Sequence, residues 1–244
     1  MTPQNIGTGP FEISYKARPE DHRGPVVADI TCPQGAVYTT VDPGADTALV
    51  QLLAEDGADS PAADIIRGAE VRLTEGRLVI AIPQSPWSGS RFFGPGGNIT
   101  FQRGIEVHIT LPGGSSVTYR GQNGSLYTSG QVENLEGQSD NGLIQVECVK
   151  NIKARTLNGP IKTDVVIGQF DAETQNGQIG VLTYVGRSAR ARSVNGSVWM
   201  SIGSSASGSI DVGTHNGSIE LHGVTGRSDL NVHTSTLNGS VRKA

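Results

Sequence analysis

The stretch Lys153–Ile161, KARTLNGPI, contains the signal that decides the fold. An Asn-Gly pair between two strand-like segments is normally the turn of a β-hairpin. The same pattern, however, recurs along the second half of this 244-residue chain, as in EGQSDNGLI, DAETQNGQI, RARSVNGSV and DVGTHNGSI. The question is therefore whether the chain forms a row of hairpins or one unit stacked on itself.

The repeats have a nearly constant length. Successive Asn-Gly pairs are separated by 18, 17, 18, 19, 21 and 22 residues, and an aliphatic residue stands three positions after each Asn. Six of the seven also have Ser or Thr two positions before the Asn. A fixed period of about 20 residues is typical of a repeat architecture. The repeated corner residues are Asn123, Asn141, Asn158, Asn176, Asn195, Asn216 and Asn238.

The pattern of charges favours a parallel stack over an antiparallel meander. Five positions before the Asn, the charge alternates in sign through Glu136, Lys153, Asp171, Arg190 and Asp211. In a β-solenoid, equivalent residues of adjacent coils stand about 4.8 Å apart, so opposite charges attract and like charges repel. In a meander they would be about 10 Å apart, where exposed charges are largely screened. We therefore expect an all-β, single-stranded parallel β-solenoid with a structural ladder of charges.

In such a solenoid each Asn-Gly pair is expected to be a corner of a coil. Gly permits a positive φ and Asn tolerates left-handed backbone, so the pair predicts a sharp turn of that kind. Stacked Asn amides are also expected to hydrogen-bond from one coil to the next.

The first half of the chain is less regular. We expect residues 1–112 to form an N-terminal β cap with the first irregular coils, and residues 113–244 to form the solenoid repeats of the same continuous domain. Runs rich in Val, Ile and Leu, such as GPVVADITC, TALVQLL and IEVHITLP, are typical of strands. The segment SPAADIIRG predicts one helical turn, with Ser60 as N-cap and Pro61 at the first helical position.

Composition and charge exclude several classes of protein. A net charge of −4 and a pI of about 5.7 give no overall attraction to nucleic acid or to a membrane surface. No apolar run approaches about 18 residues, so no membrane-spanning helix is expected. The two cysteines make no disulfide framework, and the first residues lack the regions of a secretory signal. The sequence predicts a cytoplasmic protein, or a cell-surface protein if a leader was removed.

The repeated [TS]-x-N-G-x-[ILV] units, with the preceding segments GRLVIAIP and IEVHITLPGGSSV, resemble the bacterial putative-adhesin family, a domain of unknown function. The resemblance extends from about Phe11 to Val241. It implies a β-solenoid with a capping N-terminal portion, and it supplies no catalytic motif to carry over. The chain departs from the family pattern in the loop at 84–98 and in longer last coils, which contain GSSASG and HTSTL.

A carbohydrate-active enzyme is an alternative, because lyases and hydrolases also use parallel β-helices. Glycoside hydrolysis requires two carboxylates at a defined separation, one of them with a raised pKa. Basic neighbours in the charge ladder would instead keep carboxylates ionised. No HExxH motif, Walker loop or nucleophile elbow is present, so neither a metal nor another cofactor is expected. The candidate carboxylates are Asp164, Asp171, Glu173 and Asp211.

Two groups of residues are candidates for a binding surface. Aromatic side chains in the loop at 84–98 would suit a sugar or a protein partner, or would fill the open end of the solenoid. A basic group in the middle repeats could attract an anionic polymer, although interleaved acidic residues would weaken its field. The first group consists of Trp87, Arg91, Phe92 and Phe93, and the second of Lys153, Arg155, Arg187, Arg190 and Arg192.

These observations predict a non-catalytic, adhesin-like β-solenoid scaffold that mediates protein or polysaccharide interaction. A carbohydrate-active β-helix enzyme and a self-assembling structural element remain as alternatives. We expect a protein or glycan partner, no nucleic acid, no membrane span and no cofactor, and a monomer or small homo-oligomer. Arg242 and Lys243 at the last repeat would discourage end-to-end addition.

Overall fold

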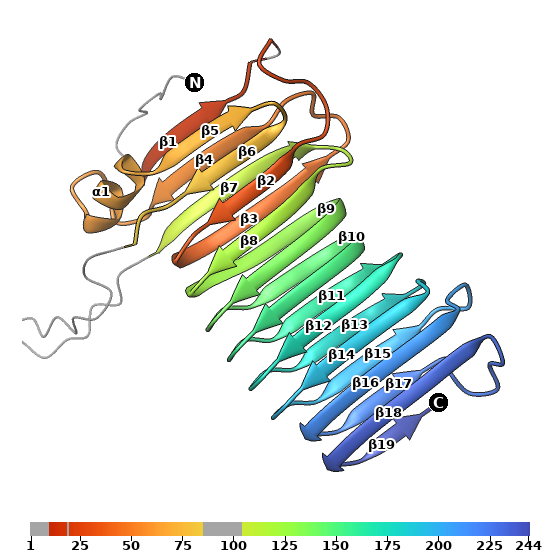
Figure 1. Cartoon of the computed structure of the whole chain (residues 1–244). Coiled ribbons are helices and arrows are strands. Elements are labelled where there is room, and N and C mark those ends of the chain that lie inside the picture. The colour runs from red at the N-terminus through yellow and green to blue at the C-terminus, as the bar shows by residue number, and fades with distance from the viewer. Residues whose placement is uncertain (1–9, 19, 85–103) are drawn as a thin grey trace, which may run out of the picture.

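The computed structural model describes residues 10–18, 20–84 and 104–244. In these residues 19 strands pair into one continuous sheet that winds into a stack of coils, and helix α1 (Pro61–Arg67) is short (Figure 1). The strands of the repeat region are parallel and pair in register from one coil to the next. The predicted all-β parallel solenoid is therefore confirmed, and the Asn-Gly pairs are not hairpin turns.

Each coil contributes one strand to each of two opposed faces, which we call face A and face B. The long strands β9 and β10 bend at mid-length and belong to both. Face A contains, in spatial order, β1 (Phe11–Lys16), β4 (Leu49–Ala54), β7 (Ile105–Pro112), β3 (Gln34–Asp42), β9 (Asn123–Ser139), β10 (Ile144–Thr156), β11 (Ile161–Val166), β13 (Ile179–Tyr184), β15 (Val198–Ile202), β17 (Ile219–His222) and β19 (Val241–Lys243).

Face B is assembled in the same way, and in the repeat region its strands are those that precede the Asn-Gly corners. It contains, in spatial order, β5 (Glu70–Thr74), β6 (Arg77–Ala81), β2 (Val27–Thr31), β8 (Ser116–Gly121), the second halves of β9 and β10, β12 (Gln169–Thr174), β14 (Ser188–Ser193), β16 (Gly208–Asn216) and β18 (Leu230–Asn238).

The core lies between the two faces. On face A the aliphatic residue three positions after each Asn points inward, and from Leu126 to Ile219 this column is at most 1% exposed. On face B small residues fill the equivalent inner column, as at Ala154, Ala172 and Ala191. Burial of these columns is the main stabilising contribution, because each coil removes apolar surface of its neighbours from water.

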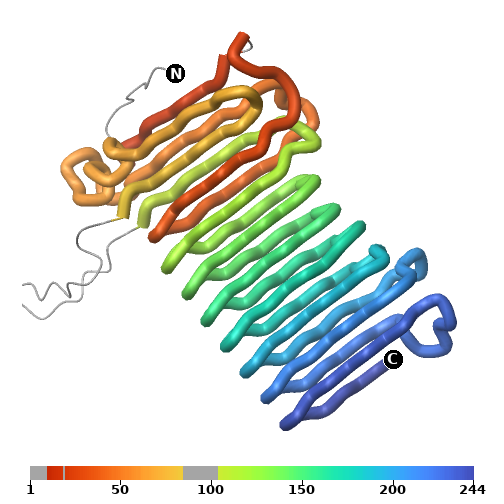
Figure 2. The backbone as a smooth tube through the Cα atoms, in the orientation of Figure 1, coloured from red at the N-terminus to blue at the C-terminus, as the bar shows by residue number. Residues whose placement is uncertain are grey.

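The first coils are not stacked in the order of the sequence (Figure 2). Strand β2 lies between β6 and β8, and β3 lies between β7 and β9. The coil made by β2 and β3 is thus inserted between two coils that come later in the chain. Strands β2, β3, β6 and β7 therefore belong to the stack of coils itself.

Antiparallel strands and the helix close the N-terminal end of the stack. Strand β1 pairs antiparallel with β4, and β5 pairs antiparallel with β6. The β5–β6 connection is a true hairpin turn, with positive φ at both Glu75 (49°) and Gly76 (75°). The parallel ladder therefore ends at this end of the stack.

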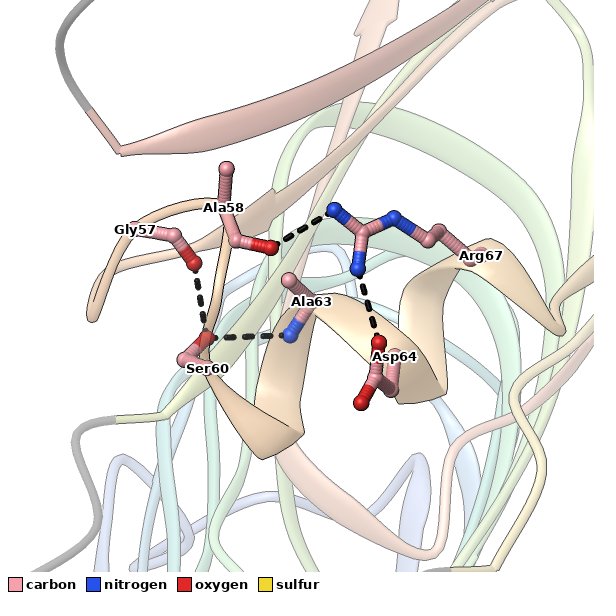
Figure 3. Close-up of polar contacts among 6 residues, drawn as sticks. All are labelled: Gly57, Ala58, Ser60, Ala63, Asp64 and Arg67. Atoms are coloured by element: carbon pink, nitrogen blue, oxygen red, sulfur yellow. Dashed lines mark hydrogen bonds and ion pairs between the residues drawn. The ribbon is translucent and has the colours of Figure 1, made fainter.

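Helix α1 begins as its sequence predicts. Ser60 is the N-cap and accepts a hydrogen bond from the Ala63 N–H at 3.1 Å (Figure 3). Pro61 occupies the first helical position, where its missing N–H costs nothing. Arg67 in the last turn donates to Asp64 at 2.7 Å and to the Ala58 carbonyl at 2.6 Å. The helix has seven residues instead of the single turn expected.

The C-terminal end of the stack is open. Val232 of β18 is only half-buried, whereas Ile210, its partner one coil earlier, is fully buried. Leu237 and Val241 are 68% and 42% exposed. In the part of the chain that the structure describes, no helix has the length and apolar character to cross a bilayer.

The Asn-Gly corners work differently from the expected left-handed turn. No corner glycine from Gly142 to Gly239 has a positive φ, so that expectation is wrong. The reason for glycine is close stacking: a Cβ on Gly177 would lie 2.0 Å from the carbonyl oxygen of Gly159 in the preceding coil. A buried hydroxyl completes the corner, since Ser193 Oγ donates to the Gly177 carbonyl at 2.9 Å. Glycine and Ser or Thr are thus required together.

The asparagines of these corners form an uninterrupted ladder along one edge of the stack. In each step the Nδ2 of one Asn donates to the Oδ1 of the Asn one coil earlier, at 2.7–2.8 Å. The ladder joins Asn123, Asn141, Asn158, Asn176, Asn195, Asn216 and Asn238. The side chains supply hydrogen bonds beside backbone that already pairs from coil to coil.

Replacing Asn176 by Ala is expected to lower the free energy of unfolding by about 1 kcal/mol, because two exposed hydrogen bonds are lost. Asn238→Ala removes a single bond at the last corner, so we expect about half that effect. Urea unfolding of both variants measures the difference. Equal losses would show that the side-chain ladder is not what stabilises the corner.

Candidate functional site

A groove runs along face B across β8, β9, β10, β12 and β14. It has a volume of about 650 Å³ and is open to solvent along its length. Its floor includes Leu135, Ile152 and Phe170, which also belong to the core. The groove crosses five successive strands, so its long axis follows the axis of the stack.

One wall of the groove is a row of uncharged polar side chains. Asn151 Nδ2 donates to Asn134 Oδ1 at 3.0 Å, and Asn134 Nδ2 donates to Ser116 Oγ at 3.3 Å. Asn151 Oδ1 also accepts from the Gln169 N–H at 3.0 Å. Each coil therefore presents an amide or a hydroxyl at the same height. The row consists of Ser116, Asn134, Asn151, Gln169 and Ser188.

The alternating charges form the other wall. The members Glu136, Lys153, Asp171, Arg190 and Asp211 face one another in register on adjacent parallel strands. Lys153 Nζ lies 3.4 Å from Glu136 Oε1. Such half-exposed pairs contribute little individually, but their alternation avoids like charges at the spacing of neighbouring strands.

Ion pairs also involve a second column of side chains, which stand two residues further along each strand than the first column. Arg155 lies 3.2 Å from Glu173 and 3.9 Å from Asp171, and Arg192 pairs with Asp211. Arg155, Arg190 and Arg192 are thus interleaved with carboxylates, which leaves face B with mixed charge instead of a continuous basic stripe. This arrangement suits a partner of mixed polarity better than an anionic polymer.

Arg155→Glu is expected to lower the free energy of unfolding by about 0.5–1 kcal/mol, because it places a third carboxylate beside Glu173 and Asp171. Adding Glu173→Arg should recover part of the loss by restoring an opposite pair on adjacent strands. Urea unfolding at low and at 1 M salt checks both points, since salt screens these exposed charges. An additive double variant would contradict the coupling.

The carboxylates considered for catalysis are not gathered at one place. Asp164 lies on β11 of face A, whereas Asp171, Glu173 and Asp211 lie on face B. Two of the latter, Asp171 and Glu173, form ion pairs with Arg155. Within the described ranges, His, Cys, Asp and Glu side chains do not gather in threes as a metal site would require.

The cysteines offer no nucleophile in the regions described. Burial raises the pKa of the Cys32 thiol to about 12, and its Sγ donates to the Gln34 carbonyl at 3.0 Å. A thiol in this environment stays protonated near neutral pH, and the thiolate is the reactive form. Cys148 is half-buried and its pKa is also raised, first by burial and then by Glu147.

The aromatic loop with Trp87, Arg91, Phe92 and Phe93 lies outside the described residues. The residues that flank it are placed. Gln84 Nε2 donates to Gln122 Oε1 at 3.1 Å, directly beside the first Asn of the corner ladder. Strand β7 begins at Ile105, next to the corner glycine Gly35.

Face A carries a row of aromatic side chains that the sequence did not reveal. The rings of His108, Tyr38 and Tyr127 stack across three adjacent strands, with centroids 4.8 Å and 5.1 Å apart. Burial raises the pKa of Tyr38, and nearby Glu106 raises it further. Further along the same column the ring of Trp199 covers Gly180 of the preceding coil.

These features define a parallel β-solenoid with two polar side faces. No family model and no curated protein sequence matches the chain. Among solved structures, it is similar to a putative adhesin from Bacteroides fragilis, with a TM-score of 0.57 and 14% identity over 96% of this chain and 97% of that one. The resemblance to putative adhesins inferred from the repeats is thus confirmed at the level of the fold.

Two further solved structures match the chain over almost their whole length with lower scores. A putative lipid binding protein from Parabacteroides distasonis has a TM-score of 0.45 and 11% identity, over 96% of both chains. A putative cell adhesion protein from Clostridium sporogenes has a TM-score of 0.40 and 10% identity, over 96% of this chain and 98% of that one.

Proposed function

We propose that this protein is a non-catalytic, adhesin-like scaffold that binds an extended protein or polysaccharide partner along its side faces. The observation that carries the proposal is the groove on face B, which presents hydrogen-bonding side chains from five successive strands. A partner lying along the groove meets an amide or a hydroxyl at each coil, about every 4.8 Å.

The chemistry of the groove supports recognition of a polar chain. Amides such as Asn151 and Gln169 offer both donors and acceptors, and the adjoining charges offer either sign. Many weak contacts repeated along one partner add up to useful affinity without a deep pocket. The fold is similar to that of the putative adhesin from Bacteroides fragilis, which supports an adhesin-like scaffold.

Binding and turnover are distinguished by one experiment. Purified protein is applied to a glycan array and used in pull-downs from bacterial and host surface extracts, with products analysed for chain cleavage. We expect binding without cleavage. The double variant Asn151→Leu and Gln169→Leu should weaken binding about 10-fold or more, since two hydrogen-bonding positions of the groove are lost.

The matched control for the groove is Ser201→Ala, which lies on face A and should leave binding unchanged. A second variant, Trp87→Ala with Phe93→Ala, tests whether the aromatic loop is the contact surface. Cleavage of a bound glycan would contradict the scaffold in favour of an enzyme. Growth of particle size with concentration in light scattering would favour the self-assembling element.

A further inference from the structure

We infer that face A carries a sugar-binding site at the end of the aromatic row, in which the Tyr127 ring packs on a sugar and Glu147 and Asp164 accept hydrogen bonds from its hydroxyls. The inference rests on the proposed scaffold function and adds to it a location and a ligand class. The site lies on the opposite face from the groove described above.

The aromatic row ends at Tyr127, and one face of its ring has no aromatic neighbour among the described residues. The rings of Tyr38 and Tyr127 are nearly parallel, with an interplanar angle of 13°. Because they stack from one strand to the next, the faces of the rings point along the axis of the stack of coils. Tyr38 covers one side of the Tyr127 ring. The next residue in the column is Gln145, so no further ring continues the row. The second side of Tyr127 is therefore turned toward the coil of Gln145.

A groove of about 410 Å³ lies at this position. That volume is within the range of sites for small ligands, about 300–1,000 Å³. Tyr38 and Tyr127 form one side of it, and the remaining polar lining comes from the same two strands, β3 and β9, and from β10 and β11, which follow the aromatic row. These lining residues are Thr40, Ser129, Gln145, Glu147 and Asp164.

The backbone holds one of the carboxylates in place. Strands β9 and β10 change register between Val146 and Cys148, so Glu147 stands at a bulge. There its Oε2 accepts a hydrogen bond from the Gly130 N–H at 3.1 Å. One oxygen of Glu147 is thereby fixed, and its remaining acceptor capacity is available to a ligand. A bulge commonly redirects a side chain beside a functional site.

The polar lining fits a neutral sugar better than a cation. A cation would need only the two carboxylates as acceptors and the face of the Tyr127 ring. Gln145 and the Thr40 hydroxyl add donors, while Ser129 Oγ donates to Thr40 Oγ1 at 3.0 Å and keeps acceptor capacity for a ligand. Sugar hydroxyls donate and accept, while the C–H groups of a sugar ring pack against an aromatic face.

The test uses the full chain on an array of neutral, acidic and basic oligosaccharides, followed by calorimetric titration with the strongest neutral ligand. We expect wild type to bind neutral oligosaccharides. Tyr127→Ala should weaken the affinity about 10-fold or more, and Glu147→Gln and Asp164→Asn about 10-fold each. Trp199→Ala removes an aromatic side chain of the same face outside the groove and should bind as wild type does.

The variants separate the site from the general function. Thermal unfolding confirms that each is folded, and Glu147→Gln and Asp164→Asn keep the shape of the side chain. Neutral-sugar binding that survives Tyr127→Ala and Glu147→Gln overturns the site and leaves the scaffold function standing. Protein binding without any sugar binding also overturns the site alone. A preference for basic ligands that disappears at high salt would overturn the ligand class. Failure to bind sugar or protein overturns both proposals.

Discussion

The variant Gly177→Ala is expected to lower the free energy of unfolding by about 3 kcal/mol. The added methyl group would lie 2.0 Å from the Gly159 carbonyl oxygen and 2.7 Å from Thr174 Oγ1. Both contacts are too short, and the first is with backbone that is itself stacked on the preceding coil. Because the corner cannot move without disturbing its neighbours, the strain has no inexpensive relief. Urea unfolding measures the loss.

The control for this variant is Gly104→Ala. Gly104 does not have a positive φ, and a Cβ there would meet no atom within 4 Å. Its substitution should therefore change stability by no more than about 0.5 kcal/mol, and the smaller entropy of the unfolded chain favours the folded state. If Gly177→Ala were as mild as Gly104→Ala, the corners would not be packed backbone against backbone.

The second large effect concerns the core of face B. Phe170 is 2% exposed and stands in register with Ala189 of the next coil. Phe170→Ala should cost about 3–5 kcal/mol, through lost burial and the cavity that remains. The reciprocal double variant, Phe170→Ala with Ala189→Phe, returns the volume to the neighbouring position. We expect it to be more stable than Phe170→Ala alone.

Leu182→Ala is the comparison for a side chain of similar character on the surface. Leu182 is 56% exposed, so its loss should change stability by well under 1 kcal/mol. Calorimetric melting of wild type, these three variants and Ala189→Phe gives the ranking. If the stability lost in the double variant equals the sum of the losses of the two single variants, residues 170 and 189 do not share one space in the core.

The repeat region could be predicted closely because the same sequence pattern recurs seven times. Alternating charge, small inner residues and a constant period all require the same parallel register, and Lys153 does stand opposite Asp171. The chemistry of the corner was harder to predict. Asn-Gly suggests a positive φ, yet here the glycine is needed because the Gly159 carbonyl occupies the space of a Cβ at Gly177. That contact belongs to two coils, so no local rule reveals it.

The first coils were predicted less well because chain order and spatial order differ. The segment QGAVYTT, which contains Tyr38, pairs residue for residue with NGSLYTS, which contains Tyr127. Gln34 thus stands where the later repeats have Asn. Alignment of these two segments would have brought the two tyrosines together. His108 has no such signal, since it joins the row only because β3 is inserted beside β7.

Disulfide trapping tests most directly the claim that residues one repeat apart are neighbours on parallel strands. In a Cys148→Ser background, one variant carries cysteines at positions 153 and 171, and the other at positions 153 and 190. The solenoid predicts that oxidation cross-links the first pair, about 4.8 Å apart between adjacent strands, and leaves the second pair open at about twice that distance. Failure of the 153–171 pair to form under conditions in which 153–190 forms would contradict the stacking, and with it the fold.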